Sequence, residues 1–455
     1  MKYKVCLIVD NPLRDLQGII LIASHLANLN VKCYIVPMYC QAFDIIAIKP
    51  DMVVANYLRP NNVDLIKRYK KENIKICILD TEGSPGRDLN KFSESISKIK
   101  EKDLVDLYCL WGHDQYKSFK SKNLFNDNII KITGCPRYDF CSYPYNKTLP
   151  DISYKKPFIL INTTFPVGNP KFTLNHKIEA QAMIDMGYEE NFAEKYAEDS
   201  LKVNIKMIKV ISQICKKFPK HNFVLRPHPF ESTEPYKHLL NNSNLEIRQE
   251  GSAIEWLNRC EALIHLNCQT AIEAAMLGKE AISIEWINTN HLKSQSPPGE
   301  ISHTPSNLDE LVHLLNAVLL NKKIKPSKKM ISERKKLIAS RLYINDGNSS
   351  LRASETILDG LTTNKKSSII TFFNFKQAMR ETLGFKFYHI LRKLIQRKKS
   401  EFRRNEKSFD YADIELIVKR LKKIDHFKKI KVSTVDNSDL SKVKMFSQNS
   451  MKIST

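Results

Sequence analysis

Two short stretches of this 455-residue chain carry side chains whose types and spacing suit chemistry on a phosphorylated sugar. Residues 226–229 read Arg-Pro-His-Pro, and the two prolines stiffen a loop that presents a cation and an imidazole. Residues 80–83 read Asp-Thr-Glu-Gly, with two carboxylates before a glycine. Cationic groups hold phosphates, whereas a carboxylate can deprotonate a hydroxyl or attack an anomeric carbon. We therefore expect a phosphate site and a catalytic carboxylate that face each other across a cleft.

The phosphate site is expected to combine Arg226 and His228 with a second group of residues further along the chain. Thr270 stands at the predicted start of a helical run, where its hydroxyl and the free backbone N–H groups suit a phosphate. Glu273, one turn on, can reach a ribose hydroxyl pair. The alternatives are that His228 is an ordinary loop histidine and that Glu273 is a first-turn acid favoured by the helix dipole.

The acidic stretch assigns different roles to its two carboxylates. Glu82 directly precedes a glycine and is expected to be exposed beside the ligand as the catalytic group. Asp80 stands at a strand end and is expected to be half-buried and to orient the loop. The alternative is that both acids are turn formers that cap a helix starting near Asp88.

Three further loops follow predicted strands and carry polar side chains. Arg137 and Asp139 either contact an anionic sugar or form a salt-bridged loop that braces the hinge. Thr163 and Thr164 follow another strand and are candidates for contact with the sugar or the acceptor. Asn267 precedes the helical run at Thr270 and is a candidate for donor binding. Open parallel sheets bind ligands at the carboxyl ends of their strands, which is where all these residues are expected.

Short apolar runs alternate with helical patterns over most of the chain, which predicts an α/β protein with parallel sheets and right-handed crossovers. The predicted strands are residues 5–9, 33–36, 52–56, 74–79, 104–111, 129–133, 158–162, 223–225, 263–266 and 281–284. The predicted helices include residues 16–29, 193–217, 271–277 and 351–361, and the last of these is expected to cross back to the first domain.

The length favours two Rossmann-like domains and an appendage. We expect an acceptor and catalytic domain at residues 1–150, a phosphate-binding domain at 151–363 and a basic tail at 364–455. Residues 141–156 suit a linker, and residues 167–192 a mobile or acceptor-side insertion. The first strand is not followed by a G-x-G-x-x-G motif, and the chain has no Walker loop, H-E-x-x-H or G-x-S-x-G, which removes the usual dinucleotide, ATPase, zincin and hydrolase interpretations.

The formal charge of +23 predicts a polyanionic partner, and the tail carries more than half of it, with 23 Lys and Arg against 9 Asp and Glu. Residues 379–394 have the spacing of a helix on anionic lipid, or of one whose apolar face docks on the protein itself. The final 25 or so residues are expected to be disordered. Ten scattered cysteines suit buried, reduced thiols in a cytosolic protein, and neither a signal peptide nor a membrane span is expected.

Six motifs, in this order, resemble those of the bacterial surface carbohydrate biosynthesis family. They are residues 79–83, 111–112, 133–139, 226–229, 270–274 and 346–350. The resemblance covers roughly residues 1–362 and leaves out the basic tail. That family has the GT-B architecture, with two Rossmann-like domains, and is similar to CMP-sugar transferases that handle Kdo or sialic acid.

The resemblance implies a role for each matching position. Glu82 or Asp80 would be the catalytic carboxylate, His228 with Pro229 would bind the CMP phosphate, and Thr270 would supply a hydroxyl partner. The chain departs from the family by having Glu82 where many relatives have Asp before the glycine, so both acids stay candidates. It also has Gln269 before Thr270 where a Ser-Ser or Ser-Thr pair is common.

The expected function is therefore that of a metal-independent GT-B glycosyltransferase that needs no cofactor. It would move a sugar from a nucleotide donor, expected to be CMP-linked, to a surface polysaccharide of the lipopolysaccharide or capsule type or to a lipid-linked glycan, at the inner face of the bacterial membrane. The alternatives are a polyol-phosphate transferase or sugar-nucleotide epimerase on the same fold, or a non-enzyme that binds membrane or nucleic acid through its tail. The chain lacks an aromatic-interleaved basic motif, which argues against nucleic acid.

Overall fold

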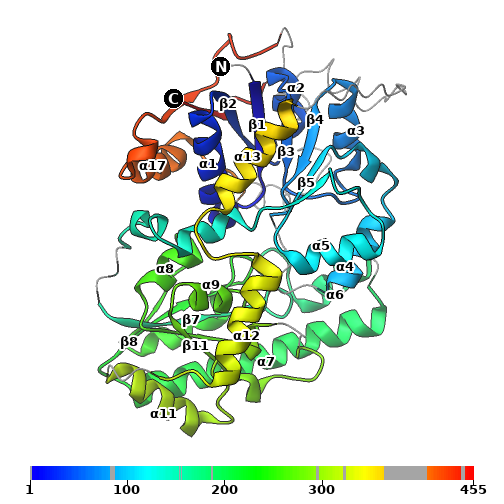
Figure 1. The fold of residues 1–455 in the computed structure, drawn as a ribbon. Coiled ribbons are helices and arrows are strands. Elements are labelled where there is room, and N and C mark those ends of the chain that lie inside the picture. Colours follow the sequence, from blue (N-terminus) through cyan, green and yellow to red (C-terminus); the bar gives the residue numbers. More distant parts are fainter. Residues whose placement is uncertain are drawn as a thin grey trace. The chain divides into compact units, whose positions relative to one another are not determined.

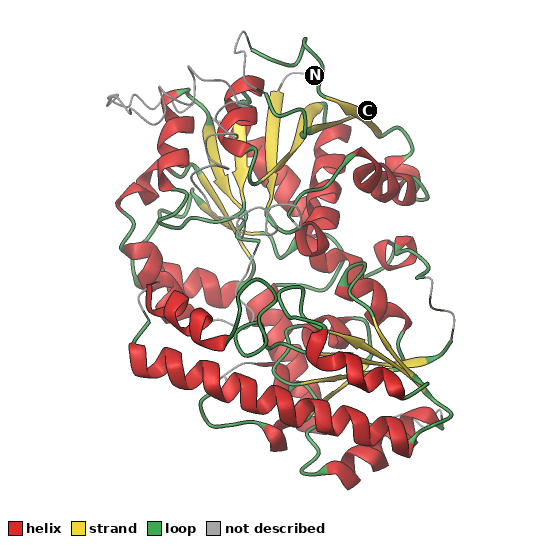
Figure 2. Cartoon of the chain, turned by 180° about the vertical axis from the view of Figure 1, so that it is seen from behind, coloured by secondary structure: helices red, strands yellow, loops and turns green. Residues whose placement is uncertain are grey.

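The computed structural model divides the chain into two compact units, each built around one β-sheet with helices on both faces (Figures 1 and 2). Unit 1 comprises residues 1–149 and 338–455, and unit 2 comprises residues 150–337. The structure describes residues 3–81, 88–152, 154, 156–185, 188–293, 297–320, 324–362, 407–441 and 446–455. The chain leaves unit 1 within the polar stretch that the sequence marks as a linker.

The sheet of unit 1 has the strand order β12-β13-β2-β1-β3-β4-β5-β6 within the described residues. Strands β1 to β6 are parallel, as the sequence predicts, and β12 and β13 add to one edge as antiparallel strands. The strands are β1 (Tyr3–Val9), β2 (Val31–Pro37), β3 (Met52–Ala55), β4 (Lys75–Ile78), β5 (Leu107–Leu110), β6 (Ile130–Ile132), β12 (Lys431–Thr434) and β13 (Met451–Ser454).

Helices cover the two faces of this sheet because each has one apolar side. One face carries an apolar core shared with α2, α3, α4 and α5, and on the other face α1 packs against α13 (Figure 1). Helix α1 starts where Asn11 accepts a hydrogen bond from the Leu13 backbone N–H and Pro12 fixes the first turn. The helices are α1 (Pro12–Asn28), α2 (Gln41–Ile48), α3 (Val63–Lys71), α4 (Leu89–Ser97), α5 (His113–Ser121), α13 (Ser349–Thr362) and α17 (Tyr411–Leu421).

Residues 338–362 belong to unit 1, where α13 lies against α1, whereas the sequence analysis had placed them by range in the second domain. The sequence pattern marked a helix at 351–361 that crosses back, and the structure has that helix. The apolar side of α13 includes Ala353, Ile357 and Leu361, which are buried against unit 1.

The described end of the chain is folded, and the expectation of a disordered terminus is wrong for residues 446–455. Strand β13 pairs with β2, and Ile453 is fully buried. Ser447 and Ser450 donate hydroxyl hydrogen bonds to the buried carboxylate of Asp44, at 2.5 and 2.6 Å. The local composition, rich in Ser, Asn and Lys, gives no sign of this strand, because the residues that stabilise it lie near the opposite end of the chain. The proposed lipid-facing segment, residues 379–394, lies outside the described residues.

The sheet of unit 2 has the order β11-β10-β7-β8-β9 within the described residues, and all its pairs are parallel. The strands are β7 (Phe158–Asn162), β8 (Asn222–Arg226), β9 (Leu245–Ile247), β10 (Ala262–His265) and β11 (Glu280–Ser283). The helices are α6 (His176–Asp185), α7 (Glu190–Lys217), α8 (Ala253–Arg259), α9 (Thr270–Met276), α10 (Pro297–Glu300), α11 (Leu308–Leu319) and α12 (Lys328–Leu337). Helices α7 and α11 share the apolar core of one face.

Two features of unit 2 differ from the expectations. Strand β9 has only three residues and the sequence analysis missed it. The segment 167–192 holds α6 and the first turn of α7. The sequence signal was weak in α6 because only Ala180 of that helix is buried, so the helix has almost no apolar side to reveal it.

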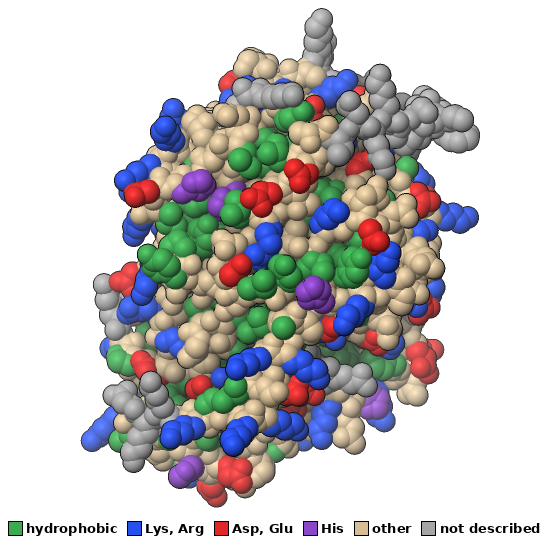
Figure 3. Space-filling model, in the orientation of Figure 1, with side chains coloured by type: hydrophobic (Ala, Val, Ile, Leu, Met, Phe, Trp, Pro, Cys, Tyr) green, Lys and Arg blue, Asp and Glu red, His purple; other side chains and the backbone are tan. Residues whose placement is uncertain are grey.

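Charged side chains of both signs are interspersed over the face of the molecule shown in Figure 3, and Lys and Arg are frequent in α12. Among the described residues, no helix combines the length and the apolar run that a membrane crossing requires. Nine of the ten cysteines are buried, as predicted.

Candidate functional site

In unit 2 the loops that follow β7 and β8 are tied together by a buried carboxylate, Glu231, which the sequence analysis missed. The Thr163 hydroxyl donates to Glu231 Oε2 at 2.7 Å, and the His228 backbone N–H donates to Oε1 at 3.4 Å. The Tyr236 hydroxyl and the Phe165 backbone N–H add further hydrogen bonds, at 2.7 and 2.5 Å. The signal in the sequence was an acid two residues after the second proline of the Arg-Pro-His-Pro stretch.

Glu231 is a positioning group and has no route to a ligand, because its side chain is fully buried. Burial raises its pKa from the ordinary 4.5 to about 7, against the lowering effect of the four hydrogen bonds it accepts. The carboxyl group thus fixes the conformation of both loops at the carboxyl end of the sheet.

His228 has one defined ring tautomer when it is neutral. Its Nδ1 accepts a hydrogen bond from the Phe230 backbone N–H at 3.2 Å, so the ring hydrogen lies on Nε2. The ring is half-buried and packs edge-on against the Phe230 ring. An imidazole N–H held in this way suits an anionic oxygen, which is the role that the sequence predicts.

Arg226 instead braces the protein. Its guanidinium donates to the backbone carbonyls of Glu250 and Gly251, at 2.5 and 2.9 Å, and lies 5.2 Å from the centre of the Trp256 ring. Burial lowers its pKa to about 10. These contacts link the end of β8 to the start of α8, so the geometry favours a structural role over the predicted contact with phosphate.

A second set of hydrogen bonds fixes the loop between β10 and α9. His265 is fully buried, accepts from the Cys268 backbone N–H at 3.3 Å through Nδ1, and pairs through Nε2 with the Ser302 hydroxyl at 2.9 Å. Burial lowers its pKa to about 3, so the ring stays neutral. Asn267, at a positive φ of 50°, donates to the Leu292 carbonyl at 3.0 Å, so this amide holds the loop.

Thr270 joins this loop to β7. Its hydroxyl accepts from Asn162 Nδ2 at 2.9 Å, and the other amide atom, Asn162 Oδ1, is buried without a hydrogen-bond partner among the described residues. Glu231 thus joins Thr163 to the His228 backbone, and Asn162, the residue before Thr163, joins Thr270, so this polar cluster is drawn from the ends of three adjacent parallel strands. Thr164 lies beside Thr163 and is half-buried, and Glu273 is buried in α9.

In unit 1 the acidic stretch is described only up to residue 81. Asp80 is buried, not half-buried as predicted, and adopts a positive φ of 51° just after β4. The Tyr108 hydroxyl donates to its carboxylate at 3.3 Å. These contacts suit the predicted orienting role. Glu82, the preferred catalytic residue, lies outside the described residues.

Asp139 caps the start of α13. Its carboxylate accepts from the backbone N–H groups of Ser349 and Ser350, at 2.9 and 2.7 Å, and from the Ser350 hydroxyl at 2.6 Å. Burial raises its pKa to about 6, although those hydrogen bonds lower it. This carboxylate braces two distant segments of one unit, so its geometry favours a structural role over contact with a sugar.

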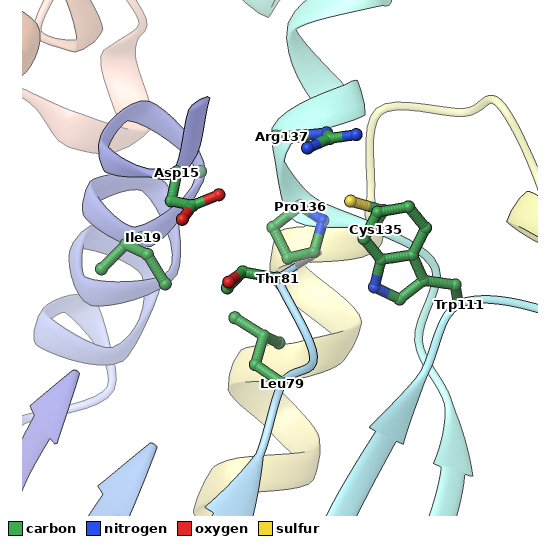
Figure 4. A pocket seen from close by; sticks show the side chains of 9 residues that line it. Asp15, Ile19, Leu79, Thr81, Trp111, Cys135, Pro136 and Arg137 are labelled. Carbon is green, nitrogen blue, oxygen red and sulfur yellow. The ribbon is translucent and has the colours of Figure 1, made fainter. Parts of the chain in front are cut away.

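Arg137 lines a small pocket at the carboxyl end of this sheet (Figure 4). Its guanidinium lies 5.2 Å from the centre of the Trp111 ring and 4.8 Å from that of Tyr138, and Nη2 donates to the Tyr138 hydroxyl at 2.9 Å. The pocket has about 260 Å³ of empty volume, open solvent included. Its lining residues are Asp15, Gly18, Ile19, Leu79, Thr81, Trp111, Cys135, Pro136 and Arg137.

Four charged side chains surround the end of β1 beside this pocket, and the sequence analysis missed them. Arg14 bridges Asp10 and Asp15, with nitrogen to oxygen distances of 3.1 and 2.6 Å, and Lys407 reaches Asp10 at 2.7 Å. Lys407 belongs to the segment treated as a tail, so no local pattern could reveal it.

Among the described residues, no group of three or more His, Cys, Asp or Glu side chains is placed to hold a metal ion.

Comparison with known proteins supports the fold. The chain matches neither a family model nor a curated protein. A candidate UDP-N-acetylglucosamine 2-epimerase of Listeria monocytogenes is similar in structure, with a TM-score of 0.50 and 13% identity over 82% of this chain and 100% of that one. The UDP-GlcNAc 2-epimerase of Methanocaldococcus jannaschii in complex with UDP-GlcNAc and UDP has a TM-score of 0.47 and 12% identity, over 78% and 99% of the two chains.

The wall teichoic acid polymerase TagF has a TM-score of 0.43 and 12% identity, over 68% of this chain and 73% of that one. At these identities the first similarity establishes the fold alone. The predicted fold class, α/β with two Rossmann-like domains of the GT-B type, is confirmed.

Proposed function

We propose that the protein is a nucleotide-sugar enzyme of the GT-B type and that unit 2 holds the phosphate of the nucleotide. The observation that carries this proposal is the half-buried His228 imidazole, which is oriented with its hydrogen on Nε2 among the braced loops of three adjacent strand ends. An imidazole N–H at the carboxyl end of a parallel sheet suits a phosphate oxygen, and loops held by the hydrogen bonds of Thr163 and Thr270 reduce the entropy lost on binding.

The reaction we propose first is glycosyl transfer, with Glu82 or Asp80 as the carboxylate that activates the acceptor hydroxyl or attacks the anomeric carbon. The CMP-linked donor of the Kdo or sialic acid type is supported by the resemblance of the motifs. The acceptor would be a surface polysaccharide or lipid-linked glycan at the inner face of the bacterial membrane. Residues 364–455, with their excess of Lys and Arg, would contact the anionic lipid.

A second candidate is epimerisation of a sugar nucleotide. It is supported by the similarity in fold to the protein from Listeria monocytogenes, whose name is that of a UDP-N-acetylglucosamine 2-epimerase. An epimerase changes the sugar without an acceptor, so the two candidates differ in their products. They share the nucleotide site, and its test is common to both.

The first experiment measures the melting temperature of the full chain with CMP, CDP, UMP, UDP and GDP, because a ligand that binds only the folded state raises it. We expect one nucleotide family to raise it and the variant His228→Ala to lose that shift. Failure of all five nucleotides would overturn the proposal.

Product analysis with the matching nucleotide sugar then separates the reactions. Transfer requires an added glycan acceptor, whereas epimerisation proceeds without one. We expect Glu82→Gln to abolish transfer and to leave the nucleotide-induced shift intact. Unchanged turnover in this variant would remove Glu82 from the mechanism and leave Asp80 as the candidate.

A further inference from the structure

The pocket of unit 1 contains a buried donor that the fold leaves unused. Trp111 directly follows β5 and is 1% exposed, and its indole Nε1 has no hydrogen-bond partner among the described residues. Figure 4 shows the indole nitrogen pointing into the pocket from one side and the Asp15 carboxylate pointing in from the other. An unpaired buried N–H destabilises a folded protein, so a tryptophan in this place calls for an explanation that phenylalanine would not.

The indole is held firmly in this orientation. Tyr138 packs edge-on against it, with ring centres 5.8 Å apart at 80°, and the Arg137 guanidinium lies over the ring. The backbone N–H of Trp111 donates to Gln115 Oε1 at 2.9 Å. Gly18 lets α1 approach the opposite wall, because a Cβ there would lie 2.8 Å from the Arg137 backbone nitrogen. The donor therefore sits in a pocket with fixed walls.

The lining defines the class of ligand. Ile19, Leu79 and Pro136 offer apolar surface, while the Asp15 carboxylate offers an acceptor. Arg14 holds that carboxylate with hydrogen bonds of 2.6 and 2.8 Å. A sugar ring combines oxygens with apolar C–H faces and therefore fits this lining.

We propose that this pocket of unit 1 binds the sugar ring of a substrate and that Trp111 Nε1 donates a hydrogen bond to one of its oxygens. The inference deepens the proposed function, since it concerns the sugar and not the nucleotide. The sugar can come from the nucleotide donor or from the acceptor. Both present the same oxygens, and the experiment separates them.

The test uses the three tryptophans of the chain, Trp111, Trp256 and Trp286, as reporters in the full-length protein. Tryptophan labelled with ¹⁵N at the indole gives one N–H resonance per residue. The Trp111 resonance is the one missing from Trp111→Phe, or, if that variant does not fold, the one that remains in both Trp256→Phe and Trp286→Phe. The indole of Trp256 donates to the Glu250 carbonyl at 2.8 Å and lies beside Arg226, so its resonance reports on unit 2.

The probes are free N-acetylglucosamine, N-acetylneuraminic acid and Kdo, the nucleotides CMP and UDP, and the nucleotide sugars UDP-N-acetylglucosamine and CMP-N-acetylneuraminate. We expect at least one sugar-bearing probe, and neither nucleotide, to shift the Trp111 resonance. A shift with a free sugar identifies the acceptor side, and a shift with a nucleotide sugar alone identifies the donor sugar.

For the probe that shifts Trp111, we expect Trp111→Phe to raise its Kd about fivefold, because one neutral hydrogen bond is lost. The matched control Trp286→Phe, in unit 2, should leave the Kd unchanged. A Trp111 resonance that no sugar-bearing probe moves overturns the inference. If nucleotides still shift the melting temperature in that case, the proposed function stands without it, so the two failures are distinguishable.

Discussion

The carboxyl ends of the two sheets present polar groups in opposite ways. In unit 2 Thr163 and the His228 backbone are hydrogen-bonded to Glu231, and Thr270 is hydrogen-bonded to Asn162. In unit 1 the buried carboxylates of Asp80 and Asp139 accept hydrogen bonds from other residues of the same unit. One donor, the Trp111 indole N–H, lies in a largely apolar pocket without a partner among the described residues.

This difference matches two kinds of ligand. A phosphate is bound by several fixed donors, so loops that are braced from behind by a buried carboxylate suit it. A sugar ring also needs apolar contact, which the pocket of unit 1 supplies through Ile19, Leu79 and Pro136. Each substitution below changes a residue in the loops at the carboxyl end of one of the two sheets, and the expected effects decrease from the first to the last.

The largest effect is expected from Glu231→Ala. This substitution leaves the buried Thr163 hydroxyl and the Phe165 backbone N–H without their acceptor and removes one of the acceptors of the Tyr236 hydroxyl. We expect the free energy of unfolding to fall by about 4 kcal/mol, as measured by urea denaturation. The matched control is Glu234→Ala, because that acid is exposed and forms a surface ion pair with Lys237, and it should change the value by less than about 0.5 kcal/mol. Equal effects of the two variants would contradict the bracing role.

The pH dependence of stability is the next largest effect. Because burial raises the pKa of Glu231 from 4.5 to about 7, the folded state keeps a proton that the unfolded state has lost within that window. The stabilisation is therefore complete below about pH 4.5 and is lost as the pH rises to about 7, by about 3 kcal/mol. We expect Glu231→Gln to reduce the slope over this range, and urea titrations at several pH values measure it. The remaining slope combines opposing contributions, since burial raises the pKa of Asp139 and lowers the pKa values of His25 and His265.

Asp139→Ala is expected to cost about 2 kcal/mol, because it leaves the buried N–H groups of Ser349 and Ser350 unpaired. Asp139→Asn keeps one acceptor oxygen and should cost about half as much. Denaturant unfolding checks both values. If either variant weakened sugar binding without loss of stability, Asp139 would contact the ligand after all, as the sequence analysis allowed.

The sequence predicted the strands because each is a short apolar run, and ten of them recur in the structure. It also located the strand-end loops, since alternation of strands and helices implies a parallel sheet whose loops meet at one edge. It missed β9 and α6, whose three residues and nearly absent apolar side leave no periodic signal.

The partners of the site residues were beyond prediction because they come from distant parts of the chain. Asp139 meets Ser349 and Ser350, and Asp10 meets Lys407. From its residue type alone Arg226 was expected to bind a ligand, whereas in the fold its guanidinium donates hydrogen bonds to two backbone carbonyls. A charged side chain in the sequence thus predicts that a polar partner exists, and the fold is needed to identify that partner.

His228→Ala is expected to weaken nucleotide binding about tenfold, which corresponds to about 1.4 kcal/mol, because an N–H donor to an anionic oxygen is lost. Isothermal titration with the nucleotide found by thermal shift measures this change. The matched control is His221→Ala, a half-buried histidine of the same unit that follows α7, which should bind normally. A normal affinity in His228→Ala would leave the cluster in unit 2 without its principal donor.

The smallest effect is expected from Thr270→Val, which keeps the shape of the side chain and removes its hydroxyl. That hydroxyl accepts from Asn162 Nδ2 at 2.9 Å, so the valine leaves the amide without this partner and loosens the link between the loops after β7 and β10. We expect the Kd for the nucleotide to rise about threefold, with Thr270→Ser close to the wild type. A loss of affinity in Thr270→Ser together with normal binding by Thr270→Val would show that the side-chain methyl, and not the hydroxyl, matters there, and would separate Thr270 from the polar cluster on which the comparison of the two sheets depends.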